Sequence, residues 1–218
     1  NFEVRKHLLK YDNVMNQQRE IIYGRRNRVL AEEELKEEFF ECLSVGVETL
    51  LNGWDSLPDE KALSKELMMK YALSVKPEAL EGLGSEEVTS LVAETAAKAY
   101  DAREKLIGSE RMRHIEKMIM LSSIDSNWKE YLREIDDLRE GISWRAYAQK
   151  DPLIEFQHEA FGLFSDLMNR IDEETAQGIM KMTAMEEQYK KSVFQSGKTV
   201  LRHSQFSSLG ASSTGEDE

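Results

Sequence analysis

Cysteine and proline are both scarce in this chain of 218 residues. Cys42 is the only cysteine, which excludes an intramolecular disulfide and a cysteine-rich metal site. Only three prolines occur, so few positions forbid a helix from continuing. The chain has no apolar run long enough to cross a bilayer as a helix, and its first residues lack the pattern of a signal peptide. This composition fits a protein of the reducing cytosol.

Positive charge is also in deficit. Lys and Arg number 29 against 41 Asp and Glu, which gives a net charge of −12 and an isoelectric point near 5.0. A nucleic-acid-binding protein needs a basic face, so we expect no nucleic-acid partner. Charged residues make up 32% of the chain, which is typical of long helices exposed to solvent.

The motifs of catalytic and cofactor sites are missing as well. No phosphate-binding loop of the G-x-x-x-x-G-K-[ST] type and no G-x-G-x-x-G pattern occurs,. The four histidines, His7, His114, His158 and His203, are not spaced as metal ligands on one helix face,. We therefore expect no catalytic residue, no bound cofactor and no metal within these residues.

What the sequence does have is helical periodicity, and we predict an all-α fold without strands. Over residues 3–31 the apolar positions recur at intervals of three, four and seven, which predicts one long helix. These positions are Val4, Leu8, Tyr11, Met15, Ile22 and Val29. The pattern continues through residues 31–50. The chain starts with Asn1 instead of Met, and its helical pattern is present from Val4, so we expect a piece of a longer chain.

The middle of the chain predicts a small helical subdomain. Asn52-Gly53 and Pro58 interrupt the pattern, because both are turn or breaker signals. A short helix is expected over about 59–74, a connector over 77–85, and an alanine-rich helix capped by Ser85 after it.

Residues 109–195 predict an antiparallel helical hairpin. An apolar stripe that includes Trp128 runs through 109–140 and indicates a buried face, and Gly141 is expected to end this helix,. Asp151 can cap the next helix with Pro152 at its first position,. We expect this second helix to extend through 172–195. The Ser, Gly and acidic composition of residues 196–218 predicts a disordered tail.

The segment between these helices, "GISWRAYAQKDP" (141–152), has two aromatics and two cations where an ordinary connection is short and polar,. Trp144 and Tyr147 could fold back onto the hairpin. Alternatively, a rigid tip presents them with Arg145 and Lys150, which would suit contact with an extended chain or a pore mouth. The segment "YDNVMNQQR" (11–19) similarly reads either as a polar helix face or as a docking seam for another domain.

Two blocks of the sequence, "VRKHLLKYDNVMNQQREIIYGRRNRVL" and "IDSNWKEYLREIDDLREGISWRAYAQKDPLIEF", closely resemble the C-terminal helical region of the SecA family. The resemblance covers about residues 3–170. It implies that residues 1–31 begin the helical scaffold, 32–108 form the helical wing, and 109–195 form the two-helix finger and the rest of the scaffold.

The resemblance also implies a function. SecA proteins are ATPases that drive preproteins through the SecY membrane channel, and their ATP and magnesium bind in motor domains that precede this region. The finger tip, here Tyr147 with Trp144, Arg145, Gln149 and Lys150, would contact the unfolded preprotein and the channel, and the hairpin would restrain ATP turnover. The long helix would dock the motor domains through Arg5, Leu8, Tyr11, Asp12, Met15 and Arg19.

By the same resemblance, the protein would be cytoplasmic and peripherally associated with the inner or thylakoid membrane, where an anionic lipid surface is a further expected partner. Two positions depart from the family pattern. Ala146 replaces the usual glycine, which restricts the backbone, and Trp144 replaces a smaller aliphatic residue. The family's Cys- and His-containing zinc tail is not found in the final "TGEDE": either this member lacks it, or the sequence stops short of it.

An alternative from a different class is a free-standing helical adaptor. It would self-associate as a coiled coil through the Leu8–Met15–Ile22–Val29 seam and would not affect any ATPase.

Overall fold

The computed structural model describes residues 2–54, 59–145 and 151–209, with side chains for 9–54, 59–142 and 151–192. Within these residues the chain is helical and has no strand, as predicted. The helices are α1 (Phe2–Ala31), α2 (Leu35–Asn52), α3 (Glu60–Tyr71), α4 (Ser85–Ile107), α5 (Ser109–Arg145) and α6 (Pro152–Leu209), with a short 3₁₀ turn at Pro77–Ala79.

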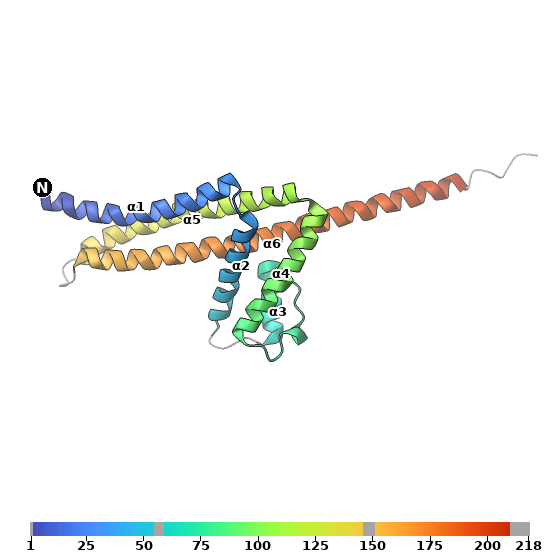
Figure 1. Ribbon diagram of the computed structural model, residues 1–218, viewed down its shortest axis with the longest axis horizontal. Coiled ribbons are helices and arrows are strands. Elements are labelled where there is room, and N and C mark those ends of the chain that lie inside the picture. Colours follow the sequence, from blue (N-terminus) through green and yellow to red (C-terminus); the bar gives the residue numbers. More distant parts are fainter. Residues whose placement is uncertain (1, 55–58, 146–150, 210–218) are drawn as a thin grey trace, which may run out of the picture.

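Three long helices, α1, α5 and α6, lie side by side and form an elongated bundle (Figure 1). Helices α2, α3 and α4 form a lobe that projects from the side of this bundle, near the middle of α6. The predicted hairpin is present, because α5 and α6 run antiparallel and pack along each other. The chain therefore has a long stem and a side lobe.

The join between α1 and α2 corrects one prediction, because the helix does not continue through residues 31–50. Glu32 and Glu34 have φ values of 60° and 51°, which lie in the left-handed region that ends a right-handed helix. Two such residues let the chain turn sharply, so that α2 leaves the bundle and enters the lobe. Lys117 on α5 pairs with Glu32 at 2.7 Å and holds the corner.

Gly141 does not end its helix, which is a second correction. Helix α5 continues to Arg145, although a glycine inside a helix costs about 1 kcal/mol relative to alanine. Leu138 and Ile142, on either side of Gly141, are both buried. The apolar stripe therefore passes through the glycine, and tertiary packing outweighs its low helix propensity.

Helix caps explain two of the other boundaries. The backbone N–H of Leu153 donates to Asp151 Oδ1 at 2.9 Å, which confirms Asp151 as the cap of α6. Ser85 is instead the first residue of α4, and its cap is Gly84, whose N–H donates to Glu87 Oε2 at 2.8 Å. Helix α6 reaches Leu209, beyond the boundary at 195 expected for the tail, and residues 210–218 lie outside the described residues.

A continuous core joins the lobe to the bundle. In the lobe, Phe39 on α2 stacks on Tyr100 of α4 with ring centroids 5.4 Å apart. In the bundle, Trp128 stacks on Tyr131 at 5.4 Å, and Trp128 is 8% exposed, which confirms it as a core residue. Stacked aromatics bury large apolar areas, so this core fixes the lobe against the stem.

Candidate functional site

Helix α1 exposes a row of apolar residues that its own chain does not cover. Leu9, Tyr23 and Leu30 are 64%, 48% and 42% exposed. They are spaced by multiples of seven, so they share one face of the helix. We call the face that carries these three residues the outer face of α1. Such an uncovered apolar row on a long helix marks an interaction surface.

A groove runs between the outer face of α1 and the adjoining face of α5. Tyr23 lies edge-on to Trp128, with ring centroids 6.5 Å apart. Arg26 pairs with Asp125 through two hydrogen bonds, at 2.8 and 3.2 Å, and this pairing raises the pKa of the guanidinium. The groove is lined by Ile22, Tyr23, Arg26, Asn27, Asp125, Trp128 and Lys129. Aromatic and arginine side chains of this kind are enriched at protein interfaces.

The residues predicted from sequence to dock the motor divide into two groups. Asp12 and Arg19 are exposed and remain available to a partner. Tyr11 and Met15 instead pack against the core, and the Tyr11 ring centroid lies 4.7 Å from that of Phe156 on α6. Both side chains are only partly buried, and their docking role stays a prediction. The side chains of Arg5 and Leu8 lie outside the described residues.

Sequence reasoning missed the outer face because it followed the densest apolar stripe of α1. That stripe is the one that the rest of the chain covers: Ile22 and Val29 are 1% and 0% exposed. The outer row has only three apolar residues among Asn and charged neighbours. Its one detectable signal was the spacing of 14 and then 7 residues between Leu9, Tyr23 and Leu30.

The tip residues predicted to contact a polypeptide, Trp144, Arg145, Tyr147, Gln149 and Lys150, have side chains outside the described residues. The helices that carry the tip are described, and α5 ends at Arg145 while α6 begins at Pro152. Near the tip, α6 also exposes Ile154 (64%) and Phe161 (75%). These two residues are seven apart, so the hairpin carries a further apolar face that the sequence analysis did not single out.

The root of the side lobe is held by a buried arginine of α1. Arg25 Nε pairs with Glu38 Oε1 of α2 at 2.6 Å, and its Nη2 pairs with Asp172 Oδ1 of α6 at 2.5 Å. Burial works against the charged form of Arg25, but Asp172, Cys42 and Glu38 together outweigh it and raise the pKa, so the guanidinium stays charged. Arg25 Nη2 also donates to Cys42 Sγ at 3.1 Å. Burial and the nearby Asp172 raise the pKa of this thiol, so Cys42 is an inert structural residue.

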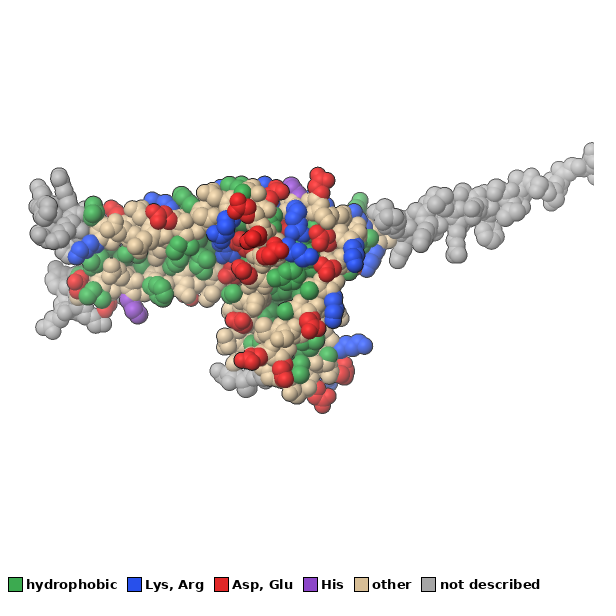
Figure 2. Space-filling view, viewed as in Figure 1, with side chains coloured by type: hydrophobic (Ala, Val, Ile, Leu, Met, Phe, Trp, Pro, Cys, Tyr) green, Lys and Arg blue, Asp and Glu red, His purple; other side chains and the backbone are tan. Residues whose placement is uncertain are grey.

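A second buried charge lies where α4 meets α5. The Tyr100 hydroxyl donates to Glu116 Oε1, and Arg113 Nη1 lies 3.1 Å from Glu116 Oε2. Glu116 is fully buried, and this burial raises the pKa of its carboxyl although Tyr100 and Arg113 act in the opposite direction. Figure 2 shows acidic and basic side chains gathered over this middle part of the molecule, where the lobe joins the stem.

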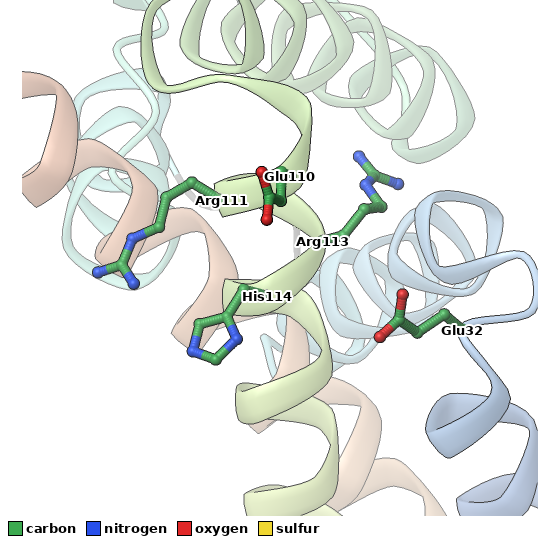
Figure 3. A pocket seen from close by; sticks show the side chains of 5 residues that line it. All are labelled: Glu32, Glu110, Arg111, Arg113 and His114. Atoms are coloured by element: carbon green, nitrogen blue, oxygen red, sulfur yellow. The ribbon is translucent and has the colours of Figure 1, made fainter.

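The hollow beside this junction lies between the α1–α2 corner and the start of α5 (Figure 3). Glu32, Glu110, Arg111, Arg113 and His114 line it. Arg111 and Arg113 point in opposite directions, and Arg111 already pairs with Glu186 at 2.5 Å. The charged groups therefore do not converge on one point, and the hollow has no set of groups arranged for a small ligand.

The described residues contain neither a cluster of metal ligands nor a helix that could span a membrane. No group of three or more His, Cys, Asp or Glu side chains lies close enough together there to hold a metal ion. None of the helices in that part of the chain combines the length and the apolar character needed to cross a membrane.

Comparison with known proteins places these features in a family. The family model described as the SecA Wing and Scaffold domain matches residues 1–183. The protein translocase subunit SecA of Chloroherpeton thalassium is 41% identical over 84% of this chain. That of Pelodictyon phaeoclathratiforme is 38% identical over 100% of this chain. These matches cover 18% and 22% of the two relatives, so the chain spans about a fifth of their length. The chain belongs to the SecA family, in the region of its wing and scaffold domain.

Proposed function

We propose that this chain is the scaffold, wing and finger part of a protein-translocating ATPase. Its match to the SecA Wing and Scaffold domain over residues 1–183 carries this proposal. In this assignment the long helix α1 with α5 and α6 is the scaffold, the lobe of α2, α3 and α4 is the wing, and the α5–α6 hairpin is the finger. The chain itself supplies no catalytic residue, and ATP and magnesium bind in motor domains outside it.

The outer face of α1 is the proposed docking surface for those motor domains. Its apolar row is uncovered, and the adjoining groove offers Tyr23 and Arg26 to a partner. Asp12 and Arg19 flank this face and would add polar contacts. An apolar centre with a polar rim is the usual composition of a protein interface.

The finger would transmit motor motion to a polypeptide in the SecY channel. Helices α5 and α6 form a long hairpin whose packed faces hold it rigid. Tyr147 at its tip would contact the unfolded preprotein, together with Trp144, Arg145, Gln149 and Lys150. A rigid arm is needed for this role because a flexible one would absorb the displacement. The site of action would be the cytoplasmic side of the membrane, with the anionic lipid surface as an additional contact.

The competing adaptor hypothesis needs a surface on α1 for self-association, and the described part of its proposed seam is already covered by the chain's own helices. Ile22 and Val29 are buried against the chain's own helices, and Met15 packs against the same core. A surface that is already covered within one molecule cannot also drive self-association of folded copies, so no observation favours this second function.

The decisive experiment measures the ATPase rate of the motor part of a full-length SecA relative, with this chain added as a separate polypeptide. We expect dose-dependent suppression, because the docked scaffold and hairpin would restrain nucleotide turnover. Tyr23→Glu and Leu30→Glu should each abolish it, since a carboxylate on the outer face of α1 would have to be desolvated on docking.

Met69→Glu is the matched control, because Met69 is 60% exposed but lies on α3 in the wing. This variant should suppress the ATPase as the unchanged chain does. Suppression that survives both substitutions on α1, or no suppression by a folded chain, would contradict the docking proposal.

A further inference from the structure

Helix α1 carries two parallel rows of buried or partly buried residues with different chemistry. Met15, Ile22 and Val29 form an apolar row. A second row, also spaced by seven, consists of side chains that end in polar groups: Tyr11, Gln18 and Arg25. Every member of this polar row contacts α6: Tyr11 packs on the ring of Phe156, Gln18 bonds the backbone of Ala160, and Arg25 pairs with Asp172.

Gln18 is the member that touches both helices of the hairpin. Its Nε2 donates to the carbonyl oxygen of Ala160 on α6 at 3.4 Å. Its Oε1 accepts from the Tyr131 hydroxyl of α5 at 2.6 Å. Gln18 is 7% exposed and Tyr131 is fully buried. One amide at the centre of the bundle therefore ties α1 to α5 and α6 together.

The surroundings of this amide hold it in place. Ala160 is fully buried, and its small side chain leaves the α6 backbone accessible to Gln18. Phe164 lies edge-on to the Tyr131 ring, with centroids 5.8 Å apart. Burial raises the pKa of the Tyr131 hydroxyl, so this group stays protonated and remains a donor.

Apolar and polar contacts differ in how strictly they fix the position of one helix along another. An apolar row that repeats every seven residues packs nearly as well after a shift along the partner, because dispersion and apolar burial are not directional. A shift of seven residues, about 10.5 Å, brings the apolar row back into register but would separate Gln18 from both of its partners. Each buried group left without a partner costs about 1–3 kcal/mol. The amide thus selects one alignment among several that the apolar row permits.

We propose that Gln18 is a positioning residue that, together with the Arg25–Asp172 pair, fixes the axial register of the α5–α6 hairpin on α1. Displacement of α1 then reaches the hairpin without slip between the helices. The register claim stands on the contacts alone, and only the transmission of motor motion rests on the proposed function.

The test measures the distance between spin labels on α1 and α6 by pulsed electron paramagnetic resonance in the 218-residue chain. Asn13 and Ser165 are exposed and can be changed to cysteine for labelling, while the buried Cys42 stays unlabelled. Gln18→Met keeps the length and helix propensity of the side chain but removes both hydrogen bonds. We expect a broadened distribution, because the Arg25–Asp172 pair then limits sliding of α1 on α6 without the help of Gln18.

Tyr131→Phe is the second variant, because it removes only the hydroxyl and should broaden the distribution to a smaller extent. Met15→Leu on the apolar row is the control and should leave one narrow distance. Both test variants should keep a cooperative thermal transition and their helical content, which separates loss of register from loss of folding. A single unchanged distance in Gln18→Met or in Tyr131→Phe would overturn the proposal.

Transmission is tested separately by placing Gln18→Met in a full-length SecA that carries this chain's sequence. We expect less polypeptide translocated per ATP hydrolysed, with suppression of the ATPase through the outer face of α1 retained. If Gln18→Met loses the register but the amount of polypeptide translocated per ATP stays the same, the proposal that the register transmits motor motion is wrong. Loss of the suppression itself would count against the docking proposal instead.

Discussion

At the scale of single residues, buried polar side chains decide how the helices of this protein meet. Arg25, Arg103 and Gln18 are each less than 10% exposed, and each bonds groups on at least two other elements. Burial makes an unpaired polar group costly, so these contacts form at defined positions only. The two neighbouring arginines of α1, Arg25 and Arg26, give a direct comparison of buried and exposed pairing.

Arg25→Ala should destabilise the chain far more than Arg26→Ala. The first change leaves Glu38 and Asp172 at the lobe root without their cation, and breaking a buried pair costs about 3–5 kcal/mol. Arg26 and Asp125 are 36% and 43% exposed, so solvent screens this pair and the second change should cost far less. Urea unfolding followed by circular dichroism measures both, and equal losses would show that burial at the lobe root does not govern the difference.

Glu116 should make the stability depend on pH. Its carboxyl has a raised pKa in the folded chain because it is buried, so the folded state holds its proton more tightly than the unfolded state. Its contribution is therefore greatest below the ordinary pKa of glutamate, about 4.3, and is lost as pH rises through the folded pKa.

Glu116→Gln removes this dependence. The free energy of unfolding of the unchanged chain should fall relative to that of Glu116→Gln as pH is raised from about 4, the ordinary glutamate range. Exposed Glu130→Gln on the same helix controls for the loss of one charge. Parallel pH profiles for the unchanged chain and Glu116→Gln would contradict a raised pKa at this residue.

At the scale of elements, close packing between α5 and α6 depends on one small residue. A Cβ placed on Gly178 would lie 2.7 Å from Cγ2 of Ile119 on α5, which is too close for two carbon atoms. Ile119 is branched at Cβ and has few alternative rotamers. By contrast, a Cβ on Gly162 of the same helix would meet nothing within 4 Å.

Gly178→Ala and Gly162→Ala should therefore change stability in opposite directions. Overpacking at Gly178 costs typically about 1–3 kcal/mol, which offsets or exceeds the gain in helix propensity. Gly162→Ala has only that gain, about 1 kcal/mol. Thermal unfolding of the two variants measures the sign of each change, and stabilisation by Gly178→Ala would mean that Ile119 moves aside freely.

At the scale of the whole molecule, Arg103 joins the wing to the scaffold. From α4 it donates to the carbonyl oxygens of Ala72, at the end of α3, and of Met180 on α6, at 3.1 and 3.0 Å. It also bonds Thr183 at 3.3 Å and pairs with Glu187 at 3.3 Å. Four contacts from one side chain hold the lobe at a fixed angle to the stem.

Arg103→Ala should loosen the lobe of α2, α3 and α4 without loosening the α5–α6 hairpin. Amide hydrogen exchange should rise in α3 and α4, because local opening is easier where buried contacts are lost, while the α5–α6 hairpin away from the junction keeps its protection. Lys105→Ala, an exposed change on the same helix, should leave exchange unchanged. Exchange that rises uniformly over the chain would mean that the lobe and the hairpin unfold as one unit.

The sequence by itself determined the helices and the family. Apolar spacing predicted α1, α3, α4, α5 and α6, and Asp151 with Pro152 marked the start of α6, because these signals depend on residues near each other in the chain. The predictions failed where distant residues decide. Gly141 stays helical because Leu138 and Ile142 are buried. The turn at Glu32 and Glu34 contains no glycine or proline, so the sequence has no local signal for it.

Only the tertiary structure decided which faces of the helices are covered. Tyr11 and Met15 belong to the densest apolar stripe of α1 and turn inward, whereas Leu9, Tyr23 and Leu30 remain exposed. The sequence could not identify the partners of Gln18, because Tyr131 and Ala160 lie more than a hundred positions along the chain. Helix periodicity is a local property of the sequence, but hydrogen bonds between helices depend on how α1, α5 and α6 are arranged in space.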